Sequence, residues 1–227
     1  MVTMRDRFRR GMGVAGCALL GSAMMVLTGL TGPLAAADPD DVDANVAVPL
    51  PMPPSDRSLI RPLPVVVPVP SSWKPMTPYP YDQIRNMVTP TDITAMGEMC
   101  QWYNAQYATL RFQIDRLQTN RIDDVTGRDD DYSRGNIQQQ VDIVSGNIGQ
   151  AVDFLGPRVQ SLSQPQTPFG DHFFAVYKGE AFFKLWEQLA NVNNGILAHQ
   201  PDWFTGPSVH KAKRWGSDIH RAHVCEG

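Results

Sequence analysis

Apolar residues recur at alternating steps of three and four through most of the chain after residue 83. The first run follows Thr89-Pro90-Thr91-Asp92, a typical helix start with a hydroxyl cap, proline at the first helical position and a carboxylate in the first turn. Its apolar positions are Ile93, Met96, Cys100, Tyr103, Tyr107, Leu110, Ile114 and Leu117. This spacing predicts a helix of about four turns or more that packs lengthwise against other helices.

A polar stretch, 121–133, leads to a second run that begins near Ser133, with Asp131 or Ser133 as the expected cap. The apolar positions are Ile137, Val141, Val144, Ile148, Val152, Leu155, Val159 and Leu162. Ser145 and Gly149 lie four residues apart, so a neighbouring backbone should approach closely there. Gly156-Pro157 should end or kink this helix, because proline lacks a backbone donor and clashes with the preceding turn.

Two further helices complete the pattern. Residues 171–198 carry two apolar stripes and should form the most buried helix. The stripes are Val176, Phe183, Trp186, Ala190 and Leu197, and Phe182, Leu185, Leu189, Val192 and Ile196. The last helix, 208–225, repeats the spacing at Val209, Ala212, Gly216, Ile219 and His223. Because the loops between the helices are short or moderate, residues 83–227 are expected to form an all-α, up-down antiparallel bundle of about four helices.

The N-terminal residues 1–37 have the features of a secretory signal peptide. Four arginines precede an uncharged apolar run that closes with Ala35-Ala36-Ala37, so we expect cleavage after Ala37 and export to a secreted or periplasm-like envelope space. An uncleaved membrane anchor is one alternative, since residues 11–37 could span a bilayer. Lipidation at Cys17 is another, although most of the apolar run follows that cysteine.

The segment 38–82 contains twelve of the nineteen prolines. Because proline lacks a backbone donor and biases its predecessor toward extended conformations, neither a helix nor a central strand is expected here. One interpretation is a semi-rigid polyproline-II spacer. A second is that the segment wraps across the helical domain and covers apolar surface. A third is that residues 61–70, RPLPVVVPVP, form a docking peptide for an aromatic groove.

Removal of residues 1–37 would leave two cysteines and change the formal net charge from −3 to −6. The acidic balance argues against nucleic acid as a general partner. Exported compartments are oxidising, and an up-down bundle brings the end of its fourth helix near the start of its first. The sequence therefore predicts a disulfide between Cys100 and Cys225.

Patterns for metal binding are weak. His220 and His223 lie three apart on one helical face, but no second paired motif accompanies them, and we expect no metal or other cofactor. If the last helix packs as its spacing indicates, His223 partly faces the core and His220 is solvated. The acidic stretch 123–131 lacks the ligand positions of an EF-hand, so it is interpreted as a solvated loop.

The last predicted helix is basic in an otherwise acidic chain. Its candidate contact residues are Lys211, Lys213, Arg214, Trp215 and Arg221. A basic helix with an aromatic residue is a candidate contact for an acidic protein face or an anionic envelope component. The alternative is that acidic residues near position 40 neutralise it, or that it is simply a solvated helix face.

Motifs for nucleophilic catalysis, phosphate binding and dinucleotide binding are absent from the sequence. In outline, a signal peptide followed by a disulfide-tied helical domain, the chain resembles exported all-helical chorismate mutases. That resemblance implies an active site that gathers basic side chains from several helices, for which Arg111, Arg116 and Arg158 are the candidates.

The layout as a whole, AAADPDD followed by a proline-rich lead and a helical domain with one bridge, resembles small exported proteins of unknown function from mycobacterial-type cell envelopes. The leading hypothesis is a non-enzymatic binding or scaffold module for another envelope component, most simply a protein. A small-ligand or metal-binding bundle that uses the aromatic interior of the third helix, with His220 and His223, is the second hypothesis. An exported helical enzyme is the third.

Overall fold

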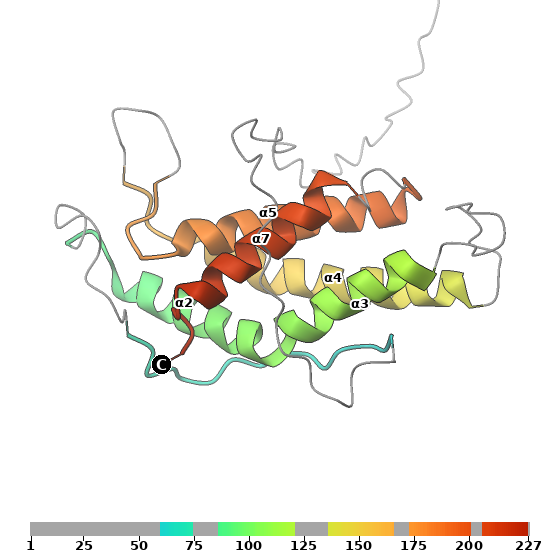
Figure 1. Cartoon of the computed structure of the whole chain (residues 1–227). Helices are drawn as coiled ribbons and strands as arrows, with labels where there is room; N and C mark the ends of the chain where they lie inside the picture. Colours follow the sequence, from blue (N-terminus) through green and yellow to red (C-terminus); the bar gives the residue numbers. More distant parts are fainter. Residues whose placement is uncertain (1–59, 75–85, 121–135, 166–172, 201–205, 227) are drawn as a thin grey trace, which may run out of the picture. The chain divides into compact units, whose positions relative to one another are not determined.

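Thr89 starts the first helix as the sequence predicts. The computed structural model describes residues 60–74, 86–120, 136–165, 173–200 and 206–226 (Figure 1). In helix α2 (Pro90–Trp102), Thr89 Oγ1 accepts from the Asp92 N–H at 3.2 Å, and the Asp92 carboxylate accepts from the Thr89 N–H at 2.7 Å. This reciprocal capping box satisfies two donors at the helix end. The second Asp92 oxygen accepts from the Ser163 N–H at 2.6 Å, so one buried carboxylate also fixes the chain that follows α4.

The first helix is long but not uniform. After α2 it passes through a π-helical turn, η2 (Tyr103–Tyr107), into α3 (Ala108–Asn120). The wider turn stacks the rings of Tyr103 and Tyr107, whose centroids are 4.8 Å apart. Every predicted apolar position from Met96 to Leu117 is buried, so the amphipathic face was correctly predicted and the π turn was not.

Helices α4 (Ile137–Gln160) and α7 (Pro207–Arg221) match two of the remaining predicted helices. Helix α4 begins later than the expected start near Ser133, and the caps proposed at Asp131 and Ser133 lie outside the described residues. Pro157 lies inside α4, which continues to Gln160, so the Gly156-Pro157 pair does not end the helix. Near the C-terminal end, the missing proline donor removes a single ladder bond, which the helix tolerates.

Helix α5 (Gly179–Leu197) starts later than predicted, because Lys178 before it adopts a left-handed conformation with φ 63°. The stripe from Phe182 to Ile196 is buried throughout. The other stripe is only partly covered, and its last member, Leu197, is 62% exposed. The helix therefore packs against the core mainly through one of its two apolar stripes.

The helices pack in the sequence α3–α4, α4–α5 and α5–α7, with α2 also against α4. Helix α7 returns to the first helix, where the hydroxyls of Tyr103 and Tyr107 donate to the carbonyls of Gly216 (2.7 Å) and Ala212 (3.1 Å). Because partner numbers fall as residue numbers rise, these two helices run in opposite directions. Within the described residues the fold is all-helical, with four helices when α2, η2 and α3 are counted as one, and has no strand.

The predicted disulfide is confirmed. Cys100 on α2 and Cys225, just after α7, are bonded, and their Cα atoms are 5.0 Å apart. A disulfide indicates an oxidising, extracytoplasmic environment. Among the helices that the structure describes, none combines the length and apolarity needed to cross a membrane.

Candidate functional site

Residues 60–74, here called the strap, lie in extended form against the first helix and α4 (Figure 1, cyan). Ile60, Leu63 and Val66 pack against the core, while the residues between them and Val67 are exposed. A repeat of three is the period of a polyproline-II helix, which presents one residue in three to a given side. Residues 60–74 therefore wrap across the helical domain, as the second interpretation of the segment 38–82 predicted. The rest of that segment lies outside the described residues.

Side-chain amides of the helices bind one end of the strap through its backbone. Asn147 Oδ1 accepts from the Leu63 N–H at 2.9 Å, and Asn147 Nδ2 donates to the Arg61 carbonyl at 2.8 Å. Gln113 Nε2 donates to the same carbonyl at 3.0 Å, and its Oε1 accepts from Asn147 at 2.6 Å. Both amides are buried, so these bonds replace the water they have lost.

Two more glutamines continue the same contact along the strap. Gln106 Nε2 donates to the Pro64 carbonyl. Gln101 binds Val69 twice: its Nε2 donates to the Val69 carbonyl at 2.8 Å, and its Oε1 accepts from the Val69 N–H at 3.0 Å. Sequence reasoning missed this set of amides, because a polar residue on a helix gives no sign that its partner is a distant backbone.

Trp73 anchors the other end of the strap. It is 7% exposed, and its indole N–H donates to the Val224 carbonyl at 2.7 Å. The strap approaches α2 closely there: a Cβ placed on Gly97 would lie 2.6 Å from Ser71 Oγ. Asn104 Nδ2 donates to the Cys225 carbonyl at 2.9 Å. Because Trp73 is bonded to Val224, the residue before Cys225, the strap and the disulfide are fixed at the same end of the helices.

The outer side of the strap is apolar and accessible. Val65, Val67 and Val69 are 71%, 76% and 62% exposed. The strap backbone is bonded to Gln106 at Pro64 and to Gln101 at Val69. Beside them, two surface hollows of ≈ 590 and ≈ 410 Å³ lie between the strap and α4. The hollows share Gly146 and Gln150, and therefore form one groove along α4.

Two buried polar atoms at this groove lack partners. Trp102 borders the larger hollow and is 1% exposed, and its indole N–H has no hydrogen-bond partner among the described residues. The Oε1 of Gln150 is likewise unpartnered there. A buried donor or acceptor without a partner costs about 1–3 kcal/mol. Both atoms are almost completely covered by the protein, so they are not points of contact for a group in the groove.

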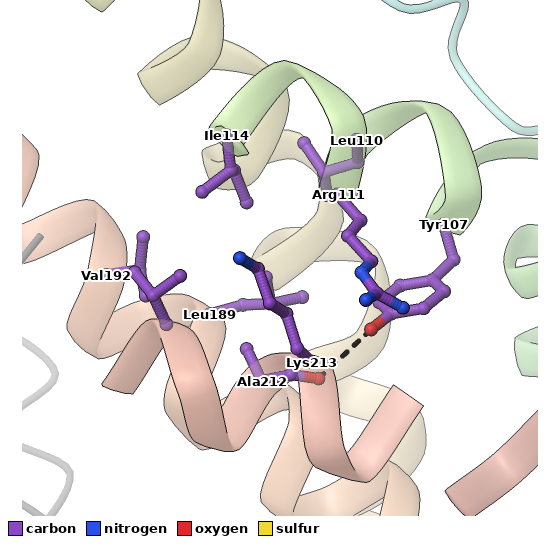
Figure 2. Close-up of a pocket in the computed structure, with 9 residues that line it drawn as sticks. Tyr107, Leu110, Arg111, Ile114, Leu189, Val192, Ala212 and Lys213 are labelled. Carbon is purple, nitrogen blue, oxygen red and sulfur yellow. Dashed lines mark hydrogen bonds between the residues drawn. The ribbon is translucent and has the colours of Figure 1, made fainter. Parts of the chain in front are cut away.

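One cavity among the described helices offers little room for a small ligand. A cavity among α3, α5 and α7 has a volume of ≈ 10 Å³, which fits about one water molecule (Figure 2). Leu110, Ile114, Leu189 and Val192 line it, and the Tyr107 hydroxyl at its edge is bonded to the Ala212 carbonyl. This cavity is therefore a packing gap and too small for an organic ligand.

The basic residues of α7 are mostly engaged within the fold. Lys211 is buried, Lys213 forms an ion pair with Asp115, and Arg214 lies over the Trp215 ring at 5.3 Å. Arg214 and Trp215 are half-buried, and of the five candidate contact residues Arg221 is the exposed one.

The two candidate metal ligands sit near the end of α7. The His220 and His223 rings are 6.4 Å apart, and His223 Nδ1 is 2.6 Å from a Glu226 carboxylate oxygen. His223 is exposed and His220 half-buried, the reverse of the expected exposures, because His223 lies beyond the helix with φ 53°. No group of three or more potential metal ligands occurs within the part of the chain that the structure describes.

The candidate arginines border different hollows. Arg111 lines the small interior cavity, whereas Arg158 borders the groove, forms a 2.7 Å ion pair with Glu98 and lies 3.7 Å over the Phe154 ring. Arg116 is exposed.

No family model, curated protein or solved structure matches the chain significantly.

Proposed function

We propose that this chain is an exported, non-enzymatic binding module of the cell envelope, and that its contact surface is the outer side of the strap together with the groove along α4. Three features support the proposal: the signal-like N-terminus, the acidic composition expected after its removal, and the up-down helical bundle. Its partner is another envelope component, most simply a protein.

One observation carries the proposal: Val65, Val67 and Val69 are exposed on a strap whose backbone is bonded to the helices at Pro64 and at Val69. Exposed apolar side chains that form a contiguous patch are typical of interaction sites. Because the strap is held in place before binding, a partner would not bear the entropy cost of ordering it.

The experiment is crosslinking in the native envelope, followed by identification of the attached component. Val65→Ser with Val67→Ser removes two exposed apolar side chains and should abolish the crosslink without lowering the melting temperature. Leu197→Ser is the matched control, because Leu197 is 62% exposed on α5. Crosslinks that survive in the double serine variant, or that are lost equally in the Leu197 variant, would overturn the proposal.

A further inference from the structure

We infer that the helical face beneath the strap is a binding site for proline-interrupted apolar peptides, and that residues 60–74 fill it as an internal ligand. This inference does not rest on the proposed function, which concerns the opposite side of the strap.

The site recognises the backbone of an extended chain. Gln101, Gln106, Gln113 and Asn147 all bond to main-chain atoms of the strap. The two strap N–H groups that they bind belong to Leu63 and Val69, each of which directly follows a proline. The prolines themselves have no N–H, so the contact pattern fits a chain in which prolines alternate with ordinary residues.

Side chains set the class of ligand. Ile60, Leu63 and Val66 face the helices at every third position, the spacing that a polyproline-II segment presents to one side. Seven residues after Val66, Trp73 enters a slot beside Gly97 and bonds to the Val224 carbonyl. The expected ligand is therefore an extended peptide with apolar residues three apart, intervening prolines and a C-terminal tryptophan. Docking of preformed polyproline-II segments in aromatic-lined grooves is a general mode of peptide recognition, and here helices supply the surface.

A tethered ligand competes strongly with a free one. Short flexible tethers give effective concentrations of about millimolar, so the wild-type strap should exclude a free peptide. Replacing a buried tryptophan with alanine should weaken strap binding by at least about 100-fold. A free peptide that retains Trp73 should then displace half of the weakened strap at a concentration on the order of 10 µM.

The test uses a fluorescent synthetic peptide with the sequence of residues 60–74 and the full chain carrying Trp73→Ala. Fluorescence anisotropy should show binding at tens of micromolar to this variant, and about 100-fold weaker binding to wild type. A peptide carrying Trp73→Ala should bind neither protein. A peptide with Val65→Ser and Val67→Ser should bind as well as the parent peptide, because those side chains face solvent.

A second protein variant covers the case in which Trp73→Ala does not fold. Val66→Ser weakens the strap at a half-buried position and should also let the parent peptide bind. Absence of binding to both strap-weakened proteins, or equal binding of the parent and Trp73→Ala peptides, would overturn the inference. The outer-face proposal is tested with the strap in place and would survive such a failure.

Discussion

The indole N–H of Trp73 donates to the backbone carbonyl of Val224 at 2.7 Å, across 151 positions of sequence. Val224 is the residue before Cys225, whose disulfide partner Cys100 lies on α2. This single bond therefore joins the extended strap to the covalent link between the first helix and the end of the chain. It explains why a segment rich in proline, which forms no helix or strand of its own, can hold a fixed position.

The Trp73 bond should be measurable in stability. Trp73→Phe keeps an aromatic ring but leaves the buried Val224 carbonyl without its donor, so we expect a loss of about 1–3 kcal/mol in the free energy of unfolding. Trp215→Phe is the control, because the Trp215 N–H has no hydrogen-bond partner within the described residues. Urea unfolding of both variants is the measurement. Equal losses would mean that the indole bond contributes nothing specific.

Gly97 should be intolerant of a side chain, because the strap passes directly over it. The added methyl of Gly97→Ala would lie 2.6 Å from Ser71 Oγ and 2.8 Å from Ser71 Cβ, and relieving that overlap should cost about 1–3 kcal/mol. In contrast, a Cβ on Gly146 meets no atom within 4 Å, so Gly146→Ala should stabilise α4 by about 0.5–1 kcal/mol. Opposite shifts of the urea midpoint are expected. Similar shifts would show that the strap does not press on α2.

Gly216 and Tyr107 form a second close approach, at the π turn. A Cβ on Gly216 would overlap the Tyr107 ring, so Gly216→Ala should destabilise the protein by about 3 kcal/mol. The cause can be isolated with a double-mutant cycle, because Tyr107→Leu removes the ring that the methyl would strike. In the leucine background the glycine substitution should cost far less. An unchanged cost would place the strain elsewhere in α7.

Periodicity predicted the helices well, because apolar spacing reports directly on which side of a helix is buried. The same logic placed Cys100 and Cys225 together, since the order of four antiparallel helices brings those ends into proximity. Boundaries were less predictable. The late start of α5 depends on the left-handed Lys178, a conformation that nothing in its side chain demands.

The strap contacts could not be found from the sequence. Asn147 and Gln113 look like ordinary polar residues on a helix, and only the fold shows that both reach the Arg61 carbonyl. The basic face of α7 stays a prediction as a contact surface. Its charge is visible in the sequence, but the pairing of Lys213 with Asp115 is visible only in the fold. In each case the missing information was the identity of a partner distant in the chain.

Removing the disulfide should cost substantial stability. The bonded cysteines are 125 residues apart, and closing a loop of that length in the unfolded chain corresponds to about 5 kcal/mol in the chain-entropy model. We expect Cys100→Ser with Cys225→Ser to lower the urea midpoint strongly, and reduction of the wild-type protein to lower it equally. If the reduced protein matches the oxidised one, the helical packing alone determines stability.

Alkaline pH should unfold the protein through its buried tyrosines. Burial raises the pKa of Tyr103 and Tyr107 well above the usual 10.0, because the phenolate would lose its hydration. The unfolded chain releases these protons above about pH 10 while the folded chain retains them. Their contribution to stability is therefore fully present below about pH 10. Above that pH, each tyrosine lowers the free energy of unfolding by up to about 1.4 kcal/mol per pH unit. Urea unfolding at rising pH measures this slope, which Tyr107→Phe should reduce. Ionisation of all six tyrosines near pH 10 in the folded protein, seen as tyrosinate absorbance, would contradict the burial of this pair.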